Sequence, residues 1–132
     1  MNEDARDNFE EDDFEEAVAR FRKMVKSNTS KYFDVFEVEG IVDHFLEDGR
    51  IKLAKKAVET GLKLHPASVA IKIRQAQVFM HEGKLEECLE LLHLAEKVET
   101  NNPDLFLTKG GVYNLLGDVE KAVEAYEHAL EL

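Results

Sequence analysis

The sequence predicts an all-α protein built from antiparallel helix pairs, and three observations support this fold class. Apolar residues recur at spacings of three and four along most of the chain, which is the period of an α-helix. No stretch alternates between apolar and polar residues as a half-buried strand does. Gly49, Gly83 and Gly117 stand 34 residues apart in similar local settings, which indicates an internal repeat.

The three glycines are expected to mark corners between helices, because glycine readily takes the left-handed conformation that ends a helix. Measured from each glycine, an aromatic ring stands four residues before it, and small residues stand five and twelve residues after it. These columns hold Phe45, Phe79 and Tyr113, then Ala54, Cys88 and Ala122, then Gly61, Ala95 and Ala129. Small residues let two helices approach closely while rings fill the adjacent grooves. A period of 34 with this content predicts a solenoid of helix pairs.

About seven helices are expected, and the first has no partner helix. It covers residues 12–27, where Ala17, Phe21 and Met24 share one helical face, and the polar run from Ser27 to Ser30 ends it. Tyr32, Phe33 and Phe36 form an aromatic cluster that is expected to pack this helix onto the first full pair. The remaining helices are expected near residues 35–48, 50–64, 67–82, 84–98, 103–116 and 118–131.

These helices divide one continuous domain into successive parts. Residues 1–11 are expected to be an acidic, frayed tail, and residues 12–34 are expected to hold the half repeat and the aromatic linker. Full repeats are expected at 35–68 and 69–102, with a third, truncated repeat at 103–132. Nine acids and one base lie between residues 1 and 16, and two interpretations of them stay open: a solvated lead-in to the first helix, or a docking site for a basic partner.

The third repeat resembles the tetratricopeptide repeat family. The residues that match the family pattern are Phe106, Gly110, Tyr113, Gly117, Ala122, Tyr126 and Ala129, and Pro66 stands where a proline separates units. The chain departs from the pattern at Gln75 and Lys109, where the family prefers leucine, at Lys72, where it prefers a large aromatic residue, and at Thr100, where it prefers proline. The resemblance implies a right-handed superhelix whose first helices line a concave groove.

Composition narrows the functional classes. With 28 acids and 17 bases the net charge is -11, which repels phosphate backbones and anionic lipids, so we expect neither nucleic-acid nor membrane binding. The single Cys88 and the acidic start favour a reducing compartment, and we expect a cytoplasmic protein. The five histidines lack the spacing of a helical zinc site. We therefore expect no metal, no cofactor and no enzymatic activity.

The resemblance implies which side chains line the groove. They are Phe36, Glu39, Asp43 and Leu46 in the first repeat, Ile73, Arg74, Gln77 and Met80 in the second, and Leu107, Thr108, Gly111 and Asn114 in the third. Family members that hold the terminal carboxylate of heat-shock chaperones use basic and amide side chains here, whereas Glu39 and Asp43 would repel a carboxylate. A substitution of Ile73 by Glu is expected to weaken partner binding without unfolding the protein.

Two functions fit these features. The first is a non-catalytic protein–protein interaction module that takes a peptide or partner segment in the groove; the second is a structural scaffold or self-association segment of a longer repeat protein. A lining of ordinary helix residues without a ligand remains a third interpretation. The partner is not identified by the sequence.

Apolar residues cover about half the circumference of the last helix, which is more than one partner helix hides. Ala125, Ala129 and Leu132 are predicted to form an exposed edge there. Either the chain is part of a longer array, or it forms a weak homodimer through this helix, which Ala129→Glu would abolish.

Overall fold

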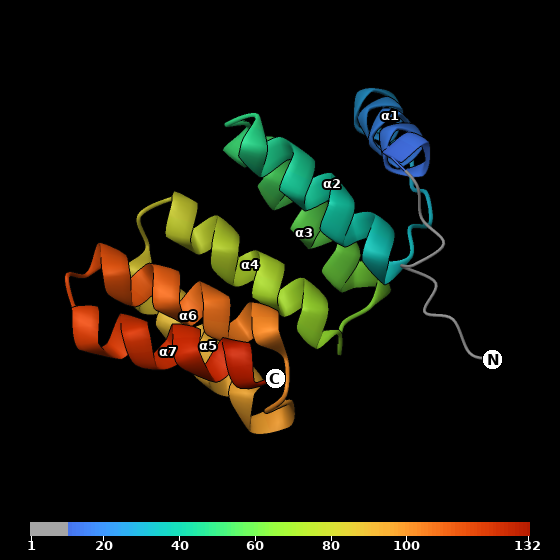
Figure 1. The fold of residues 1–132 in the computed structure, drawn as a ribbon. Helices are drawn as coiled ribbons and strands as arrows, with labels where there is room; N and C mark the ends of the chain where they lie inside the picture. The colour runs from blue at the N-terminus through green and yellow to red at the C-terminus, as the bar shows by residue number, and fades with distance from the viewer. Residues whose placement is uncertain (1–10) are drawn as a thin grey trace. The chain divides into compact units, whose positions relative to one another are not determined.

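A computed structural model describes residues 11–132, and these residues form seven α-helices and no strand (Figure 1). The all-α prediction is confirmed, and each predicted helix end lies within two residues of the observed one. The expected frayed tail lies outside the described residues apart from Glu11, where the first helix begins. The helices are α1 (Glu11–Ser27), α2 (Val35–Glu47), α3 (Ile51–Leu64), α4 (Val69–His81), α5 (Leu85–Val98), α6 (Pro103–Leu115) and α7 (Val119–Glu131).

The glycine corners have the predicted left-handed conformation. Gly49, Gly83 and Gly117 have φ values of 72°, 79° and 81°, a region that side chains other than glycine rarely adopt. The amide after each glycine donates a hydrogen bond to the carbonyl of the aromatic residue in the preceding helix, at 2.7, 2.9 and 2.9 Å. These bonds satisfy carbonyls that a helix end leaves unpaired. The same local structure therefore occurs three times, at the 34-residue spacing of the glycines.

The described residues form two compact units, one that ends at residue 71 and one that begins at residue 72, so the division falls inside α4. The core of the first unit, between α1, α2 and α3, is aromatic. Phe21, Phe33 and Phe45 are at most 1% exposed, and the Phe21 ring centroid lies 6.0 Å from that of Phe33 and 5.8 Å from that of Phe45. The half repeat therefore packs onto the first full pair through Phe21 and, of the three residues in the predicted aromatic cluster, through Phe33.

The aromatic linker between α1 and α2 is only partly buried. Phe33 is in the core, whereas the expectation that Tyr32 packs there is wrong, because its side chain is 60% exposed. Tyr32 instead lies edge-on to the ring of His65 at the end of α3, with centroids 5.6 Å apart. His65 Nε2 also lies 2.8 Å from the Phe33 carbonyl oxygen. These contacts hold the linker against α3.

Helix α2 begins at a capping box in which the Asp34 side chain and Glu37 satisfy each other's backbone amides. The Asp34 amide donates to Glu37 Oε1 at 2.9 Å. Arg20 of α1 donates to Glu37 Oε2 at 2.6 Å and also pairs with Glu16. The Glu37 carboxylate therefore caps the N-terminus of α2 and also links α2 to α1.

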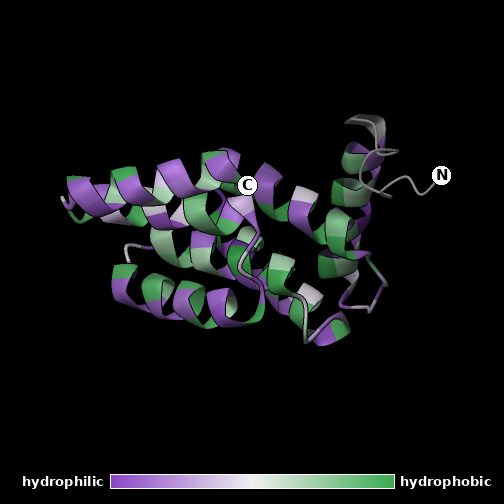
Figure 2. Ribbon diagram, turned by 60° about the horizontal axis from the view of Figure 1, so that its bottom comes forward, coloured by the Kyte–Doolittle hydropathy of each residue, from purple (hydrophilic) through white to green (hydrophobic). Residues whose placement is uncertain are grey.

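The second unit, with α5, α6, α7 and most of α4, packs through smaller residues. Cys88, Leu92, Leu105 and Val112 are wholly buried. Gly110 lies under the Tyr126 ring, where an added Cβ would meet the ring at 2.5 Å, so this small residue permits α6 and α7 to approach closely. Along the helices hydrophilic and hydrophobic segments alternate, as amphipathic helices require (Figure 2).

Candidate partner-binding surfaces

In the first unit, the predicted groove residues of α2 differ in how accessible they are. Phe36, Asp43 and Leu46 are half-buried, while Glu39 is only 4% exposed. A carboxylate with so little surface is not available to meet a basic ligand. The prediction that Glu39 lines a binding surface is therefore corrected, and Asp43 remains the accessible acid of this set.

In the second unit, two of the predicted groove residues of α4 belong to the interior. Ile73 is 1% exposed and Arg74 is 9% exposed, and Arg74 Nη1 lies 3.6 Å from Asp104 Oδ2 of α6. Helix α4 is buried on most of its sides, with Val69, Ile71, Ala76 and Val78 buried as well. Because apolar residues lie on several sides of α4, its helical periodicity did not indicate which side is exposed. The expectation that Ile73→Glu leaves the fold intact is therefore wrong, since the substitution would place a charge in the core.

The other predicted residues of α4 and α6 do lie together at an accessible surface, which we call the α4–α6 face. Gln77 Nε2 donates to Thr108 Oγ1 at 3.1 Å, and Met80 Sδ lies 3.4 Å from the position that a Cβ on Gly111 would take. Thr108 is buried and its hydroxyl bonds the Asp104 carbonyl. Leu107 is 48% exposed. The face comprises Gln77, Met80, Leu107, Gly111 and Asn114.

The predicted edge of α7 is on the wrong side of the helix. Ala125 and Ala129 are 7% and 9% exposed, and only Leu132 of the predicted set is open. The accessible apolar residues follow the spacing i, i+4, i+7, i+11 instead, and we call them the α7 stripe: Val119, Val123, Tyr126 and Leu130. A helical wheel gave the width of the apolar arc, but it did not show which margin α6 covers. The spacing itself was visible in the sequence.

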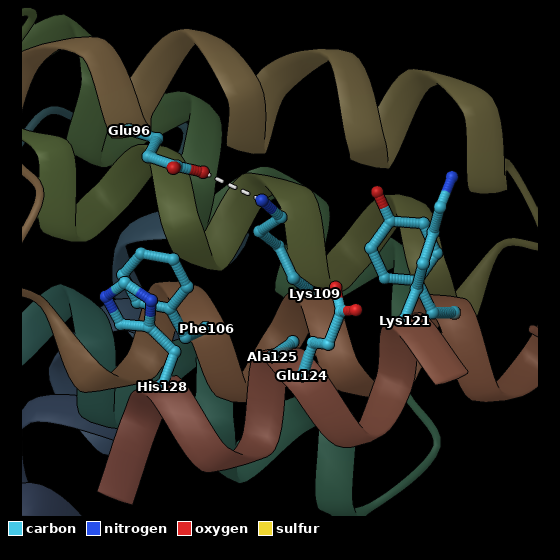
Figure 3. A pocket seen from close by; sticks show the side chains of 8 residues that line it. Glu96, Phe106, Lys109, Lys121, Glu124, Ala125 and His128 are labelled. Atoms are coloured by element: carbon cyan, nitrogen blue, oxygen red, sulfur yellow. Dashed lines mark hydrogen bonds and ion pairs between the residues drawn. The ribbon is translucent and has the colours of Figure 1, made fainter. Parts of the chain in front are cut away.

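A pocket of about 260 Å³ opens over α6 between α5 and α7 (Figure 3). Two pairs of its side chains contact each other across helices. Lys109 Nζ lies 2.8 Å from Glu96 Oε1 of α5, and the rings of Phe106 and His128 are stacked with centroids 3.9 Å apart. These two contacts join α6 to α5 and to α7.

Three further properties of the described part of the chain concern metal binding, thiol reactivity and membrane crossing. No group of three or more side chains there has the arrangement of a metal site. Burial raises the pKa of the Cys88 thiol to about 11, so at neutral pH the thiol is protonated and a poor nucleophile. Among the same residues, no helix combines the length and apolar character that crossing a membrane requires.

Helix pairs in a 34-residue register define the class: an α-helical repeat protein. A scan against known protein families matches residues 103–132 to the tetratricopeptide repeat. These are the residues in which the family pattern is most complete. A search of curated protein sequences finds no match.

Two solved structures share the fold. A thermophilic TPR protein of Thermus thermophilus is 24% identical with a TM-score of 0.70, and the similarity covers 91% of this chain and 66% of that one. MamA is 20% identical with a TM-score of 0.64, and the similarity covers 99% of this chain and 75% of that one. The chain thus spans about two thirds of the length of the first protein. The tetratricopeptide repeat resemblance is confirmed, by sequence in the third repeat and by fold across the described helices.

Proposed function

We propose that this protein is a non-catalytic interaction module that binds an apolar peptide or partner segment through the first helices of its repeats. Tetratricopeptide repeats generally serve protein–protein interaction, and this chain has the repeat and the fold. The α4–α6 face is the surface in the second unit that supports the proposal. In the first unit, Phe36, Asp43 and Leu46 of α2 are the accessible residues of the corresponding helix.

The observation that carries the proposal is the exposure of Leu107. Its side chain is 48% exposed although Leu105 and Phe106 beside it are buried, so α6 has an apolar residue on its outer side. Half-buried Met80 belongs to the same face, and its flexible thioether adapts to differently shaped partners. Gln77 and Asn114 provide amide groups at the margin for bonds to a partner backbone.

A displayed library of random peptides tests the proposal even though the natural partner is unidentified. Peptides selected on the intact protein should be rich in apolar residues, and Leu107→Glu should weaken their binding at least tenfold, because it places a charge against an apolar contact. Leu94→Glu on α5 is the matched control, since Leu94 is also exposed, at 58%. Equal binding of selected peptides to both variants would contradict the proposal, as would a failure to select any peptide.

Self-association is a second candidate, and the α7 stripe favours it. Four accessible apolar side chains on one helical face are unfavourable in water by roughly 25 cal/mol per Å² of apolar surface. A second copy of the chain would cover the stripe, which gives a homodimer or a contact within a larger scaffold. The cytoplasm is the compartment we propose, because the one cysteine is a buried thiol, which a reducing environment preserves.

A further inference from the structure

Charge is unevenly distributed within the first unit of this acidic protein. Residues 17–33 contain five bases and no acid, and residues 49–71 contain five bases and a single acid, Glu59. The intervening residues 34–48, which include α2, contain six acids and neither lysine nor arginine. The net charge of -11 therefore hides a strongly basic region formed by the second half of α1, its following turn, and α3.

The two basic segments meet at a pocket of about 240 Å³ where α1 ends beside the second half of α3. Three lysines line it: Lys31 follows α1, and Lys56 and Lys63 lie on one face of α3 at i and i+7. Thr60 stands between the two α3 lysines on that face, and Thr29 and Ser30 add two more hydroxyl groups from the turn. No Asp or Glu lines the pocket.

Helix stability explains only part of this cluster. A lysine in the last turn of a helix interacts favourably with the partial negative charge of the carbonyl end, and Lys63 has that position in α3. Lys56 lies in the middle of α3, and Lys31 lies beyond the end of α1. Within residues 11–132 none of the three lysines has an ion-pair partner within 4.0 Å. Among the described residues, therefore, no direct ion pair offsets the repulsion between these lysines.

We propose that this lysine pocket binds a phosphate-type oxyanion, either as free phosphate or as the phosphoryl group of a modified side chain. The ammonium groups supply compact point charges, and lysine is a regular ligand of phosphate in proteins. The hydroxyl groups of Ser30 and Thr60 supply hydrogen-bond donors for the remaining oxygens, while the Thr29 hydroxyl is bonded to Ser27 Oγ at 2.8 Å. The volume is well above the roughly 15 Å³ that one water needs, so it admits a phosphoryl group together with the atom to which it is esterified.

The surrounding charge favours a small anion over an extended one. A nucleic acid or an anionic lipid surface extends well beyond a pocket of this size, and the accessible acids of residues 34–48 together with the net charge of -11 repel such a ligand. A single oxyanion is short enough to contact the three lysines alone. The pocket belongs to the first unit, whereas the α4–α6 face belongs to the second, so this inference does not depend on the proposed function.

The test is a titration of the ¹⁵N-labelled full chain with sodium phosphate at pH 7.5 and constant ionic strength, followed by NMR. Amide signals of residues 28–31 and 56–64 should shift and saturate with phosphate, and sodium chloride at the same ionic strength should leave them in place. Lys56→Gln should weaken binding about tenfold, because it removes a charge-assisted hydrogen bond. Lys55→Gln is the matched control, since it removes the same charge from the next residue of α3, which does not line the pocket.

A second arm distinguishes the sources of the phosphoryl group. A short peptide with one phosphoserine should bind more tightly than free phosphate if the natural ligand is a modified side chain. It should bind more weakly if the natural ligand is a free anion. Either order of affinities supports the proposed pocket. An oligoglutamate peptide serves as the competitor of different chemistry. The proposal is overturned if phosphate and phosphopeptide shift no more than chloride does, if oligoglutamate binds more tightly than both, or if the two lysine variants lose affinity equally.

Discussion

The two units of this chain use the same repeat register but differ in how completely they bury their apolar residues. In the first unit the aromatic column is filled by Phe45, which is wholly buried against Phe21. In the second unit the corresponding Phe79 and Tyr113 are half-buried. Of the eleven exposed large apolar side chains among the described residues, ten lie in the second unit and only Tyr32 lies in the first.

This difference shows that a repeat register sets the backbone without deciding the function of each surface. The glycine corners and small-residue columns are equivalent in both units, so both form helix pairs. Residues outside those columns determine what is left accessible. The first unit has a closed aromatic core and separated charges on its surface, and the second presents apolar side chains that a partner can cover.

The largest expected effect comes from truncating the aromatic column. Phe45→Ala should lower the free energy of unfolding by about 3–5 kcal/mol, because it leaves a cavity in a packed core. The equivalent Phe79→Ala should cost less, about 1–2 kcal/mol, since Phe79 keeps part of its surface in water. Urea unfolding followed by circular dichroism measures both values. Equal losses would show that the two units are equally closed.

Cys88 tests whether the second unit has a closed core beneath its exposed apolar surface. Its pKa of about 11 in the folded protein exceeds that of a free thiol near 9, so folding favours the protonated form. The resulting stability is present below pH 9 and is lost as the pH rises from about 9 to 11, by about 3 kcal/mol for two pKa units. Cys88→Ala lacks this contribution, and Ala54 and Ala122 fill the same column.

The difference in unfolding free energy between wild type and Cys88→Ala, measured at several pH values, isolates this contribution. Wild type should lose stability relative to the variant above pH 9. A thiol reagent at pH 8 should also react with Cys88 about a hundredfold more slowly than with a free cysteine. Rapid labelling of the native protein would mean that the core around Cys88 opens to solvent.

Alanine substitutions at two helical glycines, Gly61 and Gly111, compare the tight packing of the first unit with the looser α4–α6 face. A Cβ at Gly61 would lie 2.6 Å from Val38 Cγ1 and 3.2 Å from Ile71 Cδ1, both on buried side chains. Gly61→Ala should therefore destabilise the protein by about 1–3 kcal/mol. Gly111→Ala meets only Met80 Sδ at 3.4 Å and should add up to about 1 kcal/mol from helix propensity. Thermal unfolding shows whether each substitution raises or lowers the stability. Destabilisation by Gly111→Ala would show that the α4–α6 face is tightly packed at this position.

The smallest expected effect concerns self-association through the α7 stripe. The isolated chain should form a dimer of micromolar or weaker affinity, and Leu130→Glu should abolish it by introducing a charge on the stripe. Leu130 is 86% exposed, so the variant should fold normally. Val98→Glu on α5 removes a similarly exposed side chain and should leave the dimer intact. Sedimentation equilibrium that finds only monomer at high concentration would refute the dimer and leave the stripe to another partner.

The fold was predictable from the sequence because the corners are local. A glycine with positive φ, a ring four residues before it and small residues after it can be recognised without distant contacts, and the helix boundaries follow from them. The packing of Phe21 onto the first pair was predictable for a similar reason, since Ala17 and Phe21 repeat the spacing of Ala122 and Tyr126.

The accessible surfaces were less predictable, because exposure depends on which neighbours cover each side of a helix. Helix α4 is apolar on several sides, so nothing in its sequence showed that Ile73 faces inward while Met80 keeps accessible surface. On α7 the arc had two margins, and the sequence did not reveal that Ala125 and Ala129 lie on the covered one. The lysine pocket was missed because a summed net charge conceals basic residues that lie far apart in sequence and meet only in the fold.

The most direct test of the account is an NMR titration of the labelled chain with a peptide selected from the displayed library. Binding should shift the amide signals around Gln77, Met80, Leu107 and Asn114, while signals from α1 and α3 stay in place. Such a pattern would show that the apolar face of the second unit is the binding surface and that the closed core of the first unit is not. Shifts confined to α1, α2 and α3 would contradict the account.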